Sequence, residues 1–127
     1  FPLAIGDWRG RFPLLAATRD YVGHLGALRT EAPMRLLAHA YVRYLGDLHG
    51  GQQLARTVRA RFGLPADAGT RFYDFGPADA VPPLRQGFRA RLAALPLDAA
   101  QVDAVVDEAC GAFRRHLELF GQLDASR

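Results

Sequence analysis

The sequence predicts an all-α fold, and three observations support this prediction. Apolar residues recur at 3.6-residue spacing along several segments, as they do on one face of an amphipathic helix. One segment in the middle of the chain is apolar nearly all round, which is typical of a helix at the centre of a fold. No stretch shows the apolar–polar alternation of a half-buried strand. At 127 residues, of which 50% are hydrophobic, the chain suits one domain, residues 1–127.

The first two expected helices fill the N-terminal half. The first spans residues 13–29, and its apolar stripe consists of Leu14, Leu15, Tyr21, Val22, Leu25 and Leu28. The second spans residues 31–62 and is the central one. Thr30 is its expected N-cap, and Gly63 and Pro65 are its expected stop.

The last two expected helices follow a long connection, residues 64–81. Pro82 and Pro83 suit the first turn of the third helix, where a missing N–H does no harm. Asp98 and Gln101 have capping-box spacing at the start of the fourth helix, which runs to about residue 123. The apolar stripes of these helices are Leu84, Phe88, Leu92 and Leu95, then Val102, Val105 or Val106, Ala109, Phe113, Leu117 and Phe120.

The composition narrows the class of protein. The single cysteine, Cys110, cannot form an internal disulfide, which fits a reducing compartment such as the cytoplasm. Its apolar neighbours predict that it is a small buried side chain. The net charge is +3 and all sixteen basic residues are scattered arginines, so nucleic acid is not an expected partner. No apolar run approaches the ~20 residues of a membrane span, so the membrane is not an expected partner either.

The segment "YLGDLHGGQQ" places three glycines inside the second helix. Each should cost that helix roughly 1 kcal/mol relative to alanine. Gly46 and Gly50 are four residues apart, so they expose a strip of bare backbone on one face. The strip could accept a closely packed helix or a flat ligand, and the spacing alone does not decide between them.

Charged residues near this strip also allow two interpretations. Asp47 needs a partner or water, and Arg43 is placed for an ordinary i, i+4 ion pair. Asp47 could instead organise water beside a ligand. Arg85 and Arg89, also four apart, suit either a solvated surface or an anionic ligand.

None of the four histidines has the spacing of a metal-binding motif. His39 lies in the apolar run "LLAHAY" and is expected to be a hydrogen-bonded core residue. His24 and His116 are expected on the surface, and His49 lies inside the glycine segment.

The segment "AHAYVRYLGDLHGGQ", residues 38–52, closely resembles the signature of the haem oxygenase family. That signature, A-H-A-Y-x-R-Y-L-G-D-L-x-G-G-Q, specifies thirteen of fifteen positions, and all thirteen match. The resemblance extends more weakly over residues 16–123. It implies a multi-helical haem-oxygenase-like bundle in which the second helix is the kinked, glycine-containing distal helix.

The resemblance also implies roles for individual residues. The backbone at Gly46 and Gly50 would lie against the haem plane. Asp47 would be the catalytic residue, holding water that delivers protons during oxygen activation. The other implied haem-binding residues are Tyr41, Arg85 and Arg89 at the propionate edge and Phe113 against the macrocycle.

The activity implied by the resemblance is the oxidative cleavage of haem to biliverdin, carbon monoxide and ferrous iron. Haem is both substrate and cofactor, molecular oxygen is consumed, and electrons come from a separate reductase or ferredoxin. In the family the axial histidine lies on a helix before the region that begins here. Residues 1–127 are therefore expected to be an N-terminally incomplete domain without a metal ligand, because His49 occupies a variable position of the signature.

Two other functions are compatible with the sequence. A haem-oxygenase-like protein that has lost the reaction could serve as a non-catalytic binding or interaction module. The helices could also form a structural scaffold whose glycine face packs against another helix, for example in a dimer that covers an exposed apolar face.

Overall fold

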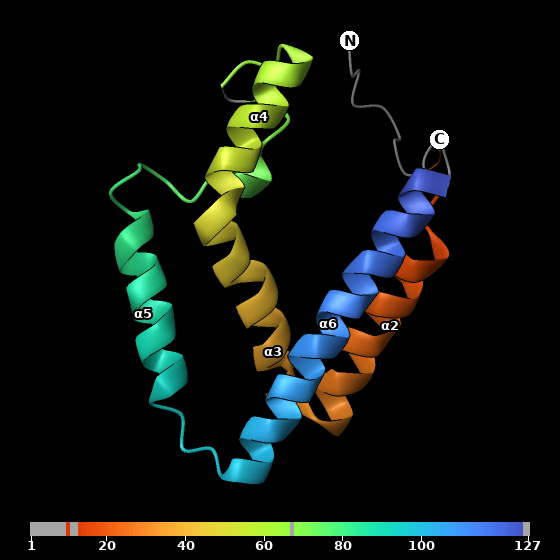
Figure 1. The fold of residues 1–127 in the computed structure, drawn as a ribbon, viewed down its shortest axis with the longest axis vertical. Helices are drawn as coiled ribbons and strands as arrows, with labels where there is room; N and C mark the ends of the chain where they lie inside the picture. Colours follow the sequence, from red (N-terminus) through yellow and green to blue (C-terminus); the bar gives the residue numbers. More distant parts are fainter. Residues whose placement is uncertain (1–9, 11–12, 67, 126–127) are drawn as a thin grey trace.

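The computed structural model describes residues 10, 13–66 and 68–125, and within them it contains helices and no strand. Helices α2 (Ala16–Glu31) and α6 (Ala99–Ala125) lie side by side and antiparallel (Figure 1). Helix α3 (Leu36–Ala40) packs against both of them, and α5 (Val81–Ala93) lies on the far side of α3 from α2. The all-α prediction is confirmed.

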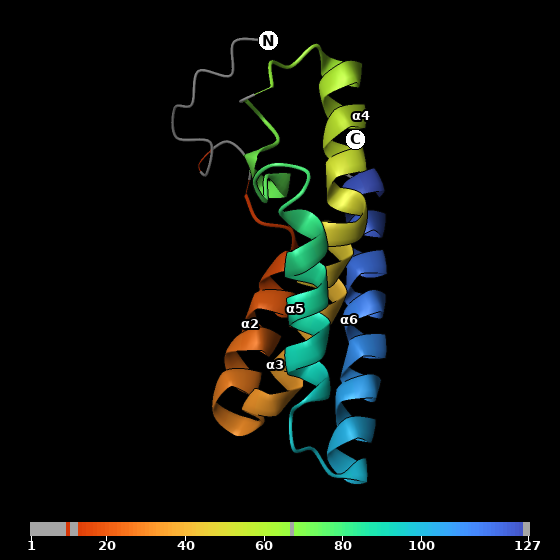
Figure 2. The same cartoon turned by 90° about the vertical axis from the view of Figure 1, so that its left-hand side faces the viewer.

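The second expected helix is continuous from residue 36 to residue 62, and we call it the central helix. It comprises α3, η2 (Tyr41–Leu45), η3 (Asp47–Gly51) and α4 (Gln52–Phe62). Both η2 and η3 are π-helical, a wider winding that is rare and often found at functional sites. The helix changes direction between α3 and α4 (Figures 1 and 2), so the expected kink is present and coincides with the π-helical turns.

The boundary between the first two helices differs from the prediction. Thr30 is not an N-cap but lies inside α2, where its hydroxyl donates to the carbonyl of Ala27 at 3.0 Å. The chain leaves the helical conformation only at Ala32, where φ is −151°. A short 3₁₀ turn, η1 (Pro33–Arg35), then leads into α3. The Thr30 hydroxyl is used in a hydrogen bond to a backbone carbonyl of its own helix, and this bond competes with capping of the following helix.

The first helix begins at Ala16 and not at residue 13, whereas the predicted stop of the second helix and the predicted starts of the third and fourth are confirmed. Gly63 follows α4 with a left-handed φ of 61°, as a helix-terminating glycine does. The amide of Gln101 donates to the Asp98 carboxylate at 2.8 Å, and the amide of Asp98 donates back to the Gln101 side chain at 3.0 Å. This reciprocal capping box starts α6. Prolines occupy the first turn of α5, and the preceding connection contains one short turn, η4 (Arg71–Tyr73).

The apolar stripe of α6 does not face the core. The helix buries Glu108 and Ala112 against α2 and α3, because a small-residue face allows close approach. The exposed side chains of the stripe are Val102, Val106, Phe113, Leu117 and Phe120, which are 45–70% exposed. The prediction that Cys110 is buried is also wrong, since this free cysteine is exposed.

The buried apolar core of the described residues is small and consists of Ala17, Leu28, Ala38, Leu45, Leu48, Ala55, Val81 and Ala112. Half of these residues come from the central helix, which confirms that it is the central element. None of the helices in the described part is long and apolar enough to cross a membrane.

Candidate functional site

The three glycines of the central helix have two different surroundings. A Cβ atom built on Gly46 or Gly50 would have no neighbouring atom within 4 Å, so both residues face open space. A Cβ atom on Gly51 would lie 2.8 Å from Cδ1 of Tyr73, so Gly51 is required by packing inside the molecule. Gly46 and Gly50, which we call the glycine strip, therefore have no packing partner that explains them within the described residues.

Asp47 lies beside the glycine strip and is paired as its spacing suggested. Its Oδ2 is 3.4 Å from Nη2 of Arg43, and its side chain is 14% exposed. Arg43 is more exposed and also lies over the ring of Phe72, with its guanidinium carbon 6.0 Å from the ring centre. The carboxylate is thus held by Arg43 without being fully removed from water.

Tyr41 and Phe113 both line an apolar cavity of about 420 Å³ between the central helix and α6. Both are exposed, Tyr41 by 46% and Phe113 by 58%. Ala38 and Val106 line the same cavity. Two of the predicted haem-binding residues therefore line one cavity, whose mostly apolar lining would suit an apolar ring.

Arg85 and Arg89 lie together at a different cavity, about 580 Å³, which His49 also lines. The Nδ1–H of His49 donates to the carbonyl of Leu45 at 2.8 Å, which leaves Nε2 free to accept from Arg89 at 3.4 Å. The arginines thus lie beside the glycine segment of the central helix. Tyr41 does not line this cavity, so its contact with the same propionate edge stays a prediction.

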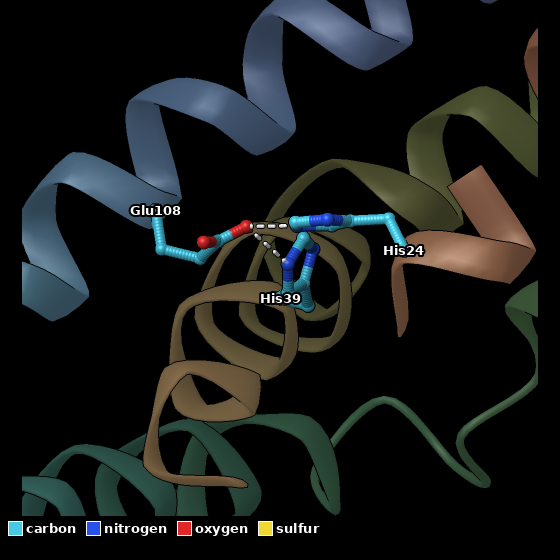
Figure 3. A group of neighbouring side chains, drawn as sticks. All are labelled: His24, His39 and Glu108. Carbon is cyan, nitrogen blue, oxygen red and sulfur yellow. Dashed lines mark hydrogen bonds and ion pairs between the residues drawn. The ribbon is translucent and has the colours of Figure 1, made fainter. Parts of the chain in front are cut away.

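A buried polar network joins α2, α3 and α6 and contains a residue that the sequence did not single out (Figure 3). Oε1 of Glu108 lies 2.6 Å from Nε2 of His24 and 3.0 Å from Nε2 of His39. The prediction that His39 is a hydrogen-bonded core residue is confirmed. His24 was expected on the surface, but its ring turns inward to Glu108 and is only 25% exposed.

The protons of this network follow from its geometry. A carboxylate only accepts, so both histidines donate from Nε2 to Glu108. In a neutral ring Nδ1 of His39 then carries no proton, and it accepts the hydroxyl of Tyr21 at 2.8 Å. The sequence gives only a weak indication that Glu108 is buried. Glu108 lies four residues from both Ala104 and Ala112, and therefore on the same small-residue face of its helix.

Burial and hydrogen bonding shift the pKa values of this network. Burial raises the pKa of Glu108, but the hydrogen bonds from His24 and His39 and the charges of the two rings outweigh it, so the pKa is lowered. Burial lowers the pKa of His39 more than its hydrogen bond to Glu108 and the charge of Glu108 raise it. Burial raises the pKa of Tyr21, against the opposing charges of Arg43 and Arg115.

These shifts predict that acid destabilises the fold in two stages. Below pH 6.5 the unfolded chain protonates His39 while the folded chain resists, so the free energy of unfolding falls. Below pH 4.5 the unfolded chain also protonates Glu108 more readily than the folded chain does, which adds to the loss. Each of the two groups changes the free energy of unfolding by at most about 1.4 kcal/mol per pH unit.

Urea unfolding at a series of pH values from 8 to 4 measures this dependence. EDTA is included so that no trace metal ion binds to the histidines. His39→Gln removes the first titrating group and should flatten the curve between pH 6.5 and 5. An unfolding free energy that is constant from pH 8 to pH 5 in the unsubstituted chain would contradict the prediction.

The fold places the chain in a known structural class. Its structure is similar to that of heme oxygenase-1 from Synechocystis sp. in complex with heme, with a TM-score of 0.87 and 36% identity over 95% of this chain and 54% of that one. It is also similar to heme oxygenase-2 from Synechocystis sp. in complex with heme and NO, with a TM-score of 0.89 and 33% identity over 94% of this chain and 50% of that one. The class is therefore the all-α haem oxygenase fold.

Sequence comparison gives the family directly. Residues 2–122 match the family described as Heme oxygenase. "Heme oxygenase 1" of Synechocystis sp. is 36% identical over 120 residues, and "Heme oxygenase" of Porphyra purpurea is 37% identical over 120 residues. Each alignment covers 94% of this chain, and 50% and 51% of the respective relative. The chain belongs to the haem oxygenase family, and it spans about half the length of the curated relatives that it matches.

Proposed function

We propose that the central helix and the residues lining the two cavities form the distal side of a haem pocket. We further propose that this chain, joined to a segment that supplies the axial iron ligand, cleaves haem to biliverdin, carbon monoxide and ferrous iron. The observation that carries the proposal is the glycine strip, because a Cβ atom at Gly46 or Gly50 would enter open space and not a packed neighbour. Each glycine costs the helix roughly 1 kcal/mol relative to alanine. A ligand that touches the exposed backbone would explain why this cost is retained.

The side chains that line the two cavities suit the parts of the haem molecule. Tyr41 and Phe113 offer apolar ring surface at one cavity, which fits the macrocycle. Arg85 and Arg89 offer planar guanidinium groups at the other cavity, which fit the propionates. When bound, haem supplies the iron at which molecular oxygen is activated. The axial iron ligand is proposed to come from a segment outside residues 1–127.

Asp47 is proposed to hold a proton near the reacting oxygen through water. Asp47 follows Gly46 directly on the central helix and its side chain is 14% exposed, so its carboxylate can bind water. Electrons are proposed to come from a reductase or ferredoxin. The free Cys110 fits a reducing compartment such as the cytoplasm.

The test compares the 127-residue chain with a completed protein, in which the N-terminal segment of the Synechocystis relative precedes residue 1. Hemin is titrated into both proteins, and a reductant is then added in air. We expect a hemin complex and biliverdin absorbance from the completed protein. A folded completed protein that binds hemin but forms no biliverdin would contradict the enzymatic proposal.

Substitution of Asp47 by Asn should slow haem cleavage by the completed protein about 100-fold or more, with hemin affinity unchanged. Proton delivery by a positioned side chain typically contributes about 10²–10⁴-fold to a rate. The measurement is single-turnover biliverdin formation alongside a hemin titration.

One observation favours a second function, a non-catalytic haem-oxygenase-like module: Asp47 already has a structural partner in Arg43. Arg43→Ala is the matched control, because it removes the pair and keeps the acid. If Asp47 only supports the helix, both variants will behave alike and neither will slow turnover. Loss of turnover in Asp47→Asn alone assigns the carboxylate to the reaction.

A further inference from the structure

The side chains of His24, His39 and Glu108 converge on one point (Figure 3), and none of the three is among the residues proposed to contact haem. Its members come from three helices and are up to 84 positions apart in the chain. One side-chain ligand atom from each residue lies within 4.8 Å of the other two. Two of the three residues, His39 and Glu108, are buried.

The chemistry of the three groups is that of a transition-metal site. Two imidazoles and one carboxylate are ligands that zinc and ferrous ions prefer, and three protein ligands leave a coordination position open. We propose that His24, His39 and Glu108 bind one divalent transition-metal ion, with Zn²⁺ as its redox-silent representative.

An ion between the three groups would require the two short nitrogen–oxygen contacts to lengthen. Ligand atoms of a tetrahedral site with bonds of about 2.0–2.1 Å are separated by about 3.3 Å. The two nitrogen–oxygen distances are 2.6 and 3.0 Å, so the ion would replace the two shared protons and move these atoms apart by less than about 1 Å. His24 is 25% exposed, so the ion can enter from its side and keep a water ligand there.

The groups around the network orient the ligands and limit the affinity. Tyr21 lies 2.8 Å from Nδ1 of His39, the position where a metal-binding imidazole usually has a hydrogen-bond partner. With the metal on Nε2, the ring proton moves to Nδ1, which then donates to the Tyr21 oxygen. Nη1 of Arg35 is 3.7 Å from Oε2 of Glu108 and opposes a cation, but its side chain is 44% exposed and can turn toward solvent.

The test is a calorimetric titration of the chelator-treated 127-residue chain with Zn²⁺. We expect one ion per chain, a higher melting temperature with Zn²⁺, and shifted Nε2 resonances of His24 and His39 in the nitrogen NMR spectrum. Mg²⁺ prefers oxygen ligands and should not bind. Absence of saturable Zn²⁺ binding, or equal binding of Mg²⁺, would overturn the proposal.

Two variants locate the ion independently. His24→Ala alters the ligand that is already partly exposed, and Glu108→Gln keeps the shape of the carboxylate while removing its charge. Each should weaken Zn²⁺ binding at least about 10-fold. Removing a residue that only hydrogen bonds to a metal ligand already weakens metal binding by about 10-fold or more, and loss of a ligand should cost no less. The matched control is His49→Ala, whose ring hydrogen bonds to the Leu45 carbonyl and to Arg89, neither of which belongs to the network, and which should leave binding unchanged. Wild-type affinity in both His24→Ala and Glu108→Gln would show that the ion binds elsewhere.

Discussion

The double substitution Gly46→Ala/Gly50→Ala is expected to stabilise the fold while weakening hemin binding about 5- to 150-fold. A Cβ atom at either position meets nothing within 4 Å, so the helix gains alanine's preference of about 1 kcal/mol per residue without a clash. A haem that touches the bare backbone would meet two new methyl groups instead. Overpacking of this kind costs about 1–3 kcal/mol, which corresponds to the stated loss of affinity.

Gly51→Ala is the matched control and should show the opposite pattern. Its Cβ atom would lie 2.8 Å from Tyr73, so the aromatic ring must move and the free energy of unfolding should fall by about 1–3 kcal/mol. Hemin affinity per folded molecule should change less than in the double variant. Urea unfolding and hemin titration of the completed protein measure both effects. Undiminished affinity in a well-folded Gly46→Ala/Gly50→Ala protein would show that the strip does not face haem.

The sequence predicts the helices well because their signals are local. The 3.6-residue spacing, the capping box at Asp98 and the stop at Gly63 involve residues within one turn of one another, and all three are observed. The prediction that Thr30 is an N-cap is wrong for an equally local reason, because its hydroxyl donates to a carbonyl of its own helix. The π-helical winding of η2 and η3 has no counterpart in the apolar pattern and could not be anticipated.

Prediction of the core fails where burial depends on partners distant in sequence. The apolar side of α6 is easily recognised, yet Phe113 and Leu117 are 58% and 70% exposed. The periodicity shows that this side of the helix is apolar, but it does not specify which element, if any, packs against it. Burial of Glu108 is the converse case, because its partners lie on helices whose packing no local pattern specifies.

Substitution of Glu108 by Ala should lower the free energy of unfolding of the metal-free chain by about 3 kcal/mol. The carboxylate accepts hydrogen bonds from two rings and faces Arg35, and its removal leaves the buried His39 Nε2–H without a partner. A buried donor left unsatisfied costs about 1–3 kcal/mol, and the space left by the deleted side chain adds to this. Such a loss is a large part of a typical domain's stability of about 5–15 kcal/mol.

Two further variants separate the network from the general effect of changing α6. Glu108→Gln keeps the volume and one accepting oxygen, so its loss should be smaller, about 1 kcal/mol. Glu118→Ala changes an exposed glutamate of the same helix and should stay within about 0.5 kcal/mol of the unsubstituted chain. Urea unfolding in EDTA with an unchanged denaturant slope gives the three values. If Glu108→Ala costs no more than Glu118→Ala, the three-helix network does not hold α2, α3 and α6 together, and packing of the small-residue face alone must do so.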